Sequence, residues 1–160
     1  MPLLLRTVRE NRWHKAPAAE WLQRGDVPAD PIGDLPTSQN RLSVWEVAAD
    51  RSNLERIVRA VALTKDKVAD TGYVLFNSEL LPTIGVGTSE EEKGQTPDKD
   101  ANAWHRDLTD LSGNKLVALT KAILEGGESG TVLKKRLLQL IEAGIHEKQL
   151  PEKFRSKLTS

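Results

Sequence analysis

The sequence predicts an α+β fold: a small mixed, partly parallel sheet covered by helices, with a helical C-terminal third. Three observations support this prediction. Short apolar runs that suit a buried, pleated surface occur at 2–8, 42–48 and 73–76. Apolar residues at helical spacing fill the segment between the last two runs and most of the chain after residue 112. A chain of 160 residues with 38% hydrophobic residues can bury one core, so we expect a single domain over 1–160.

The segment after the first predicted strand should contain a short helix and then irregular structure. Pro17 fits the first turn of a helix that ends at Arg24, because Gly25 favours a helix stop. On this helix we expect Trp21 to face the core. Residues 25–41 combine prolines, glycines and aspartates, which indicates an irregular surface segment.

The two central strands should be joined by a helix. Ser52 and Glu55 have the spacing of a capping box, in which each side chain binds a free backbone N–H, so we expect a helix over 53–69. The connection between 42–48 and 73–76 is long enough for a crossover between parallel strands. A right-handed strand–helix–strand unit is therefore predicted.

The last third of the chain should form three helices. Ser112 can cap the first helix, which would stop at Gly126. Thr131 can cap the second, and Pro151 can open a short third helix. We expect all three to pack on the sheet, because this would bury both sets of apolar residues in one core.

Residues 87–103 interrupt this pattern with five acidic residues against two lysines. Connectors longer than about 12–15 residues are uncommon inside compact domains and tend to be functional or disordered. We therefore expect a mobile acidic connector at 87–103, with two lobes hinged there as the alternative arrangement. Trp104, at the exit of the connector, would either pin it to the body or serve as an exposed contact for another protein.

Composition excludes several classes of function. The 23 basic and 23 acidic residues give a formal net charge of +0, which argues against binding to nucleic acid or to an anionic membrane. The absence of cysteine excludes disulfides, thiolate nucleophiles and thiolate-bound metals. The apolar run at 3–5 is shorter than the roughly 7–15 residues of a signal-peptide core, so we expect a soluble, cytoplasmic protein. We expect neither a cofactor nor a bound metal.

We assign no catalytic residue, although His105 and Asp107 are candidates. Together they could act as a general base with an orienting carboxylate or, with Asp110, as metal ligands. The alternative is that both aspartates lie just before a helix and cap its free amides.

Two clusters are candidates for binding. The first consists of Trp104, His105 and Arg106, which place an aromatic ring, an imidazole and a guanidinium side by side. The second contains Arg12 and Trp13, a basic and an aromatic residue that could stack on a base or ring. For the second cluster, the alternative is that Trp13 fills the edge of the core while Arg12 is solvated.

These observations favour a non-catalytic protein–protein interaction or accessory subunit, of an adaptor or inhibitor type, whose partner is another protein. No chemical motif has the spacing that a reaction requires. An acidic connector and basic terminal helices on a neutral chain could steer a partner by complementary charge.

Two alternative functions remain open. One is a small hydrolase or lyase that uses His105 with Asp107 or Asp110 under a lid formed by 87–103. The other is a nucleic-acid-binding protein that uses basic residues of the N-terminal segment and lysines of the terminal helices. The N-terminal basic residues concerned are Arg6, Arg9 and Arg12.

Overall fold

A computed structural model describes residues 2–159, and a six-stranded sheet of order β4-β5-β2-β1-β3-β6 forms its centre. Every pair of neighbouring strands is antiparallel. The strands are β1 (Leu3–Val8), β2 (Leu42–Val47), β3 (Thr71–Asn77), β4 (Gly87–Ser89), β5 (His105–Thr109) and β6 (Glu128–Val132).

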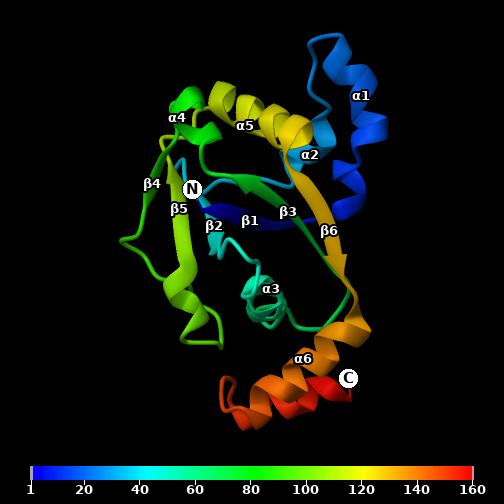
Figure 1. The fold of residues 1–160 in the computed structure, drawn as a ribbon, viewed down its shortest axis with the longest axis vertical. Helices are drawn as coiled ribbons and strands as arrows, with labels where there is room; N and C mark the ends of the chain where they lie inside the picture. The colour runs from blue at the N-terminus through cyan, green and yellow to red at the C-terminus, as the bar shows by residue number, and fades with distance from the viewer. Residues whose placement is uncertain (1, 160) are drawn as a thin grey trace.

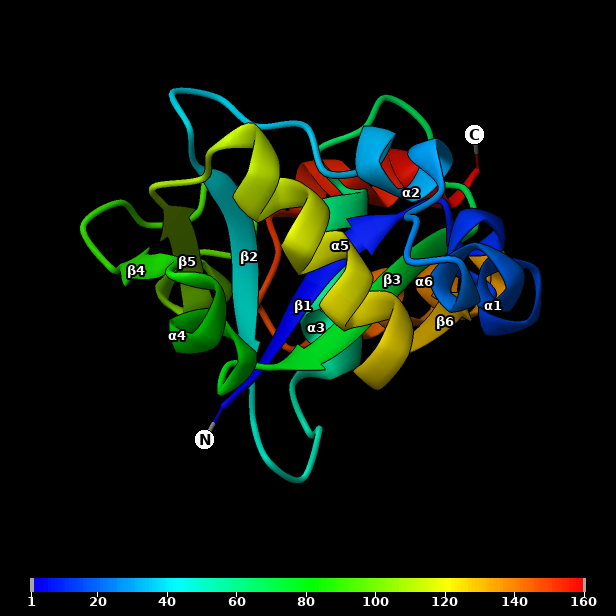
Figure 2. The same ribbon diagram turned by 90° about the horizontal axis from the view of Figure 1, so that it is seen from above.

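Helices cover both faces of the sheet (Figures 1 and 2). One face carries α1 (Lys15–Gln23), α2 (Ala29–Gly33), α4 (Leu80–Ile84) and α5 (Gly113–Gly126), together with the 3-10 helix η1 (Glu10–Trp13). The opposite face carries α3 (Leu54–Ala62) and α6 (Lys134–His146), together with the 3-10 helices η2 (Ala101–Trp104) and η3 (Glu152–Leu158).

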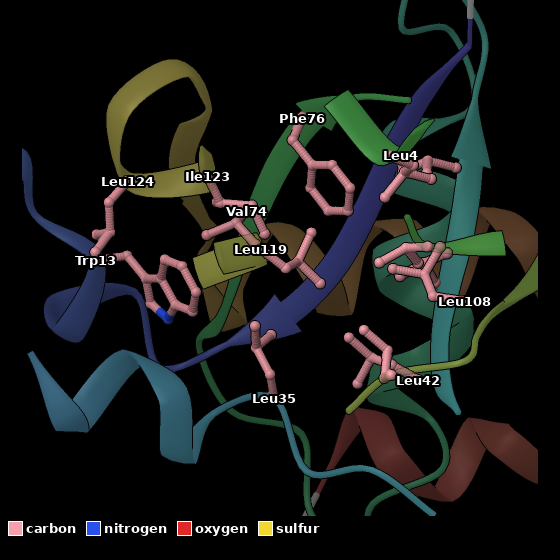
Figure 3. Packing of buried hydrophobic residues seen from close by; sticks show 14 of the residues in the cluster. Leu4, Trp13, Leu35, Leu42, Val74, Phe76, Leu108, Leu119, Ile123 and Leu124 are labelled. Carbon is pink, nitrogen blue, oxygen red and sulfur yellow. The ribbon is translucent and has the colours of Figure 1, made fainter. Parts of the chain in front are cut away.

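Alternation along the strands divides the apolar residues into two cores, because successive strand side chains point to opposite faces. Leu4 belongs to the core under α5, whereas Leu5 belongs to the core over α3. Figure 3 shows part of the core under α5, including Leu4, Val74, Phe76, Leu119 and Ile123. The core over α3 includes Leu5, Trp45, Leu75, Ile57 and Ile141.

The prediction of a partly parallel sheet is wrong. The strands predicted at 42–48 and 73–76 exist as β2 and β3, and they run in the same direction, because each is antiparallel to β1. They are not neighbours, however. The N-terminal strand lies between them, with Leu5 paired to Trp45 on one side and to Leu75 on the other.

The helix predicted over 53–69 is shorter and begins differently. It runs over Leu54–Ala62, and the Ser52–Glu55 capping box does not form. The Ser52 N–H donates to the carboxylate of Asp50, and the Glu55 carboxylate instead accepts two hydrogen bonds from Arg136.

Two further predictions about helices are wrong, and one is confirmed. Trp21 does not face the core: it is 44% exposed, and Arg24 lies 5.0 Å above its ring. Thr131 lies in edge strand β6, so α6 begins only at Lys134. Ser112 does cap α5, where its hydroxyl accepts a hydrogen bond from the Lys115 N–H at 3.2 Å.

The acidic segment 87–103 is attached to the body by a buried carboxylate. Asp98 is 0% exposed and accepts hydrogen bonds from Arg56 Nε at 2.7 Å, Arg59 Nη2 at 2.9 Å and the Ala101 N–H at 3.1 Å. Trp104 helps to hold the segment, since it is half-buried and lies under Arg56, 5.6 Å from the ring centre. Whether residues 87–103 are mobile in solution stays a prediction.

Arg59 extends this connection to the C-terminal helices. The guanidinium is buried, and it donates to the Leu140 carbonyl at 2.9 Å and to the Gln149 side chain at 2.8 Å as well as to Asp98. One arginine therefore links α3 to α6, to the turn after α6, and to the acidic segment.

We predict that Asp98→Asn lowers the free energy of unfolding by about 3 kcal/mol or more, because it leaves the buried Arg59 charge without a counterion. The hydrogen bonds from Arg56, Ala101 and Arg59 outweigh burial and hold the pKa of the Asp98 carboxyl below its ordinary value of 3.8. Its stabilising effect is therefore complete above that value and is lost as pH falls through the lowered pKa. Urea denaturation should show the gap between wild type and variant narrowing below about pH 4.

Asp100→Asn is the matched control. The Asp100 side chain is exposed and lies 3.6 Å from Arg56, so an exposed pair of this kind should contribute less than about 1 kcal/mol. Equal losses for the two variants would contradict the central role of Asp98.

A second prediction concerns Gly144, on the face of α6 against which Arg59 packs. A Cβ at this position would press on Arg59 Nη1 and lie 2.8 Å from Cζ. We expect Gly144→Ala to destabilise the protein by about 1–3 kcal/mol despite the better helix propensity of alanine. Gly126→Ala, with open space around its Cβ, should be neutral or stabilising by up to about 1 kcal/mol in the same denaturation experiment.

Candidate binding cleft

The structure places His105 and Asp107 on the same face of β5, because they are two residues apart on one strand. His105 is 8% exposed and packs edge-on against Trp45, with 5.3 Å between ring centres. Its Nδ1 donates to the Glu92 carbonyl at 2.8 Å, and its Nε2 faces Asp107 Oδ1 at 3.6 Å. Asp107 also lies 3.8 Å from Arg41.

Through its hydrogen bond to the Glu92 carbonyl, His105 holds the acidic segment against β5. A carbonyl can only accept a hydrogen bond, so Nδ1 carries a proton and is engaged, while Nε2 lies near the carboxylate of Asp107 without a hydrogen bond to it. Arg106 and Asn102 do not converge on the imidazole: Arg106 pairs with Glu46 at 3.1 Å, and Asn102 binds Thr96. The described residues thus bring Asp107, but neither Arg106 nor Asn102, to the imidazole.

The predictions for Asp107 and Asp110 as helix caps also differ from the structure. Asp107 is buried within β5, and Asp110 has a left-handed backbone with φ of 61° just after the strand. Ser112 caps the helix instead.

The second predicted cluster is divided between core and surface. Trp13 is buried, and its indole N–H donates to Asp34 at 3.1 Å, which confirms the alternative that this ring packs in the core. Arg12 pairs with the other oxygen of Asp34 at 3.1 Å and remains partly accessible. The Arg9 backbone N–H also donates to Asp34 at 3.0 Å, so this carboxylate fastens η1 to the end of α2.

A cleft of about 430 Å³ lies where β1 ends, between the segment after α2 and the loop after α3. Five basic residues line it, against two acidic residues. The basic residues are Arg6, Arg9, Arg12, Lys65 and Lys67, and the acidic residues are Asp34 and Asp70.

The two acidic residues of the cleft are already engaged. Asp34 holds Arg12, Trp13 and the Arg9 backbone, and Asp70 accepts the first N–H of α6 from Lys134 at 2.7 Å. The cleft therefore has an excess of positive charge that its own carboxylates do not neutralise.

Two of the three arginines of the cleft differ from most others in the protein. Of the eleven arginines, all within residues 2–159, eight have a described carboxylate oxygen within 4.0 Å. The three that do not are Arg6, Arg9 and Arg24, and the first two line this cleft. Arginines without a carboxylate partner are thus found mainly in this cleft.

Arg6 lies where the sheet opens. The ladder between β1 and β2 stops at the pair Leu5–Trp45, whereas β1 remains paired to β3 as far as Val8. Figure 2 shows β1 and β2 diverging beyond that point. Arg6 Nη1 crosses the opening to donate to the Ser43 carbonyl at 3.0 Å. Burial lowers the pKa of the Arg6 guanidinium, and the charge of Asp34 offsets only part of that effect.

A smaller cleft of about 290 Å³ adjoins the first and shares Arg6 and Val61 with it. It is lined by His105, Trp45 and the segment 92–96. Gly94 packs closely against Trp45. A Cβ added to Gly94 would overlap Cη2 of the Trp45 ring and lie 2.9 Å from its Cζ3.

Part of this site could be found in the sequence. Arg6, Arg9 and Arg12 were already the N-terminal basic residues of the nucleic-acid alternative. Lys65 and Lys67 were missed, because their approach to β1 depends on how the loop after α3 folds, and no local pattern reports that.

Within residues 2–159, no cluster of three or more histidine and carboxylate groups could hold a metal ion. In the same part of the chain, no helix is both long and apolar enough to cross a bilayer. Compared with known proteins, the chain matches no family model, and neither a curated sequence nor a solved structure shows significant similarity to it.

We predict that Gly94→Ala lifts the segment 92–96 from Trp45 and exposes the backbone after Lys93. Limited trypsin digestion should then cleave after Lys93 faster than in the wild type, because proteolysis follows local opening. Cleavage after Lys99, next to buried Asp98, is the internal reference and should not change. Unchanged cleavage after Lys93 would show that Gly94 does not hold this segment.

Proposed function

We propose that this protein is a non-catalytic binding protein, an accessory subunit that holds an acidic region of another protein in the cationic cleft. The observation that carries the proposal is the unneutralised charge of the cleft. Arg6 and Arg9 lack carboxylate partners among the described residues, and Lys65 and Lys67 add charge at the rim. Complementary charge of this kind steers association and selects partners.

The contacts around the alternative catalytic residues support binding rather than reaction. His105 binds the Glu92 carbonyl of the acidic segment, and Asp107 lies between His105 and Arg41. A general base needs a nitrogen within reach of the substrate proton, and His105 has one nitrogen bound to the Glu92 carbonyl and a ring that is only 8% exposed.

The lining of the cleft favours protein over nucleic acid. Its walls include aliphatic side chains such as Val8, Val61 and Ala62, and none of its lining residues is aromatic. Single-stranded nucleic acids are held mainly by aromatic stacking combined with a basic groove. The cleft offers the basic groove without the stacking surface.

We predict that Lys65→Glu combined with Lys67→Glu weakens the binding of poly-L-glutamate, a probe for an acidic protein surface, by at least about tenfold. Both side chains are exposed, so the fold should be unaffected. The thermal midpoint should rise with poly-L-glutamate for the wild type at low salt, because a ligand of the native state stabilises it. That rise should shrink with added salt and be lost in the double variant.

Lys99→Glu combined with Lys135→Glu is the matched control, since it makes the same change in net charge at exposed positions outside the cleft. It should retain the response of the wild type. The proposal fails if poly-L-glutamate has no effect on the wild type, or if both double variants respond alike. Tighter binding of single-stranded DNA than of poly-L-glutamate would favour the nucleic-acid alternative instead.

A further inference from the structure

We propose that Arg6 is an oxyanion subsite at the floor of the cationic cleft, and that its Nε–Nη2 edge takes a carboxylate from an acidic segment of the partner protein. This inference rests on the proposed function and specifies the group recognised there. Arg6 borders both adjoining clefts at the point where β1 and β2 separate.

The Arg6 guanidinium is only partly satisfied. Nη1 is engaged by the Ser43 carbonyl at 3.0 Å. Nε is buried and has no hydrogen-bond partner in the described chain. A buried donor without an acceptor is unfavourable, more so when it is charged, so native proteins rarely leave one unexplained. Arg59 Nε is also buried without a partner, but the Arg59 guanidinium has Asp98 as its counterion, whereas Arg6 has no described carboxylate within 4.0 Å. An oxyanion at this edge would supply the missing acceptor and the missing counterion together.

Other arginines of this protein show how such a guanidinium binds an anion. The same edge of the guanidinium binds carboxylates at two other sites. Arg56 donates through Nε and Nη2 to Asp98 at 2.7 and 2.9 Å, and Arg136 donates through the same two atoms to Glu55 at 2.8 and 2.9 Å. At Arg6 the Nε atom is buried without a protein acceptor, and Nη1 is held by the Ser43 carbonyl, which fixes the guanidinium in the cleft wall.

The shape and walls of the cleft favour a carboxylate over other oxyanions. A carboxylate has two oxygens that match the two donors of one guanidinium edge. A phosphoryl group shares this chemistry but has three terminal oxygens and carries more charge. The aliphatic walls formed by Val8, Val61 and Ala62 suit the methylene groups of an acidic side chain. We therefore assign the subsite to a glutamate or aspartate carboxylate, and phosphate becomes an arm of the test.

The test uses the full chain with three probes: a blocked Glu-Ala repeat peptide, its Gln-Ala match and inorganic pyrophosphate. Titration calorimetry should give binding of the Glu-Ala peptide that is at least about tenfold tighter than that of the Gln-Ala peptide. Arg6→Lys keeps the charge but loses the Nε–H, and should weaken the Glu-Ala peptide by about tenfold. Arg24→Lys, at an exposed arginine outside the cleft, should bind like the wild type.

NMR of the wild-type protein tests the subsite without depending on whether the Arg6 variant folds. The Arg6 Nε–H signal should shift when the Glu-Ala peptide is added, and not with the Gln-Ala peptide. If that signal stays fixed while backbone amides lining the cleft shift, the Arg6 subsite is wrong and the proposed function stands. Preferred binding of pyrophosphate overturns the carboxylate assignment. If no anionic probe binds, the proposed function fails together with the subsite.

Discussion

The rest of the structure depends on the buried ion pair between Arg59 and Asp98. The pair joins three parts of the chain that are far apart in sequence. Arg59 belongs to α3, Asp98 belongs to the acidic segment before β5, and Arg59 also binds α6 and the turn that follows it. A buried pair is strongly stabilised by further hydrogen bonds to its members, and Asp98 also accepts from Arg56 and the Ala101 N–H, whereas Arg59 Nε has no partner in the described chain. By fixing α3, the pair also fixes the loop that begins at its end, which forms one wall of the cationic cleft. One interaction in the interior thus shapes a surface feature on which the protein's proposed function rests.

Charge is used in two different ways in this molecule. Most arginines are matched to a described carboxylate and serve the fold, as Arg51 does with Glu128 and Arg136 does with Glu55. At the end of β1, Arg6 and Arg9 have no described carboxylate partner. They line a cleft whose two carboxylates already bind other groups. The formal net charge of +0 conceals this difference, because it averages an acidic segment with a basic cleft. A binding protein that recognises its partner by charge needs this local imbalance and no reactive group.

The sequence predicted those parts of the fold whose signal is local. The apolar runs that became β1, β2 and β3, and the cap at Ser112, were visible as patterns. Strand β5 was missed because its inward side chains at His105 and Asp107 are polar, and their burial depends on distant groups such as Glu92 and Arg41. Strand order was missed for the same reason: the insertion of β1 between β2 and β3 is a long-range pairing.

At the candidate site, the basic residues of the N-terminal segment were recognised from the sequence. The lysines opposite them and the anchoring role of Asp98 follow only from tertiary contacts.

In our proposal, the protein recognises its partner at the end of β1. The most direct measurement is a map of backbone amide chemical shifts during titration with an acidic peptide at low salt. We expect the largest changes at residues 6–9 and 61–72, where the cleft lies. Changes confined to the exposed faces of α1 or β6, or the absence of any change at saturating peptide, would contradict it.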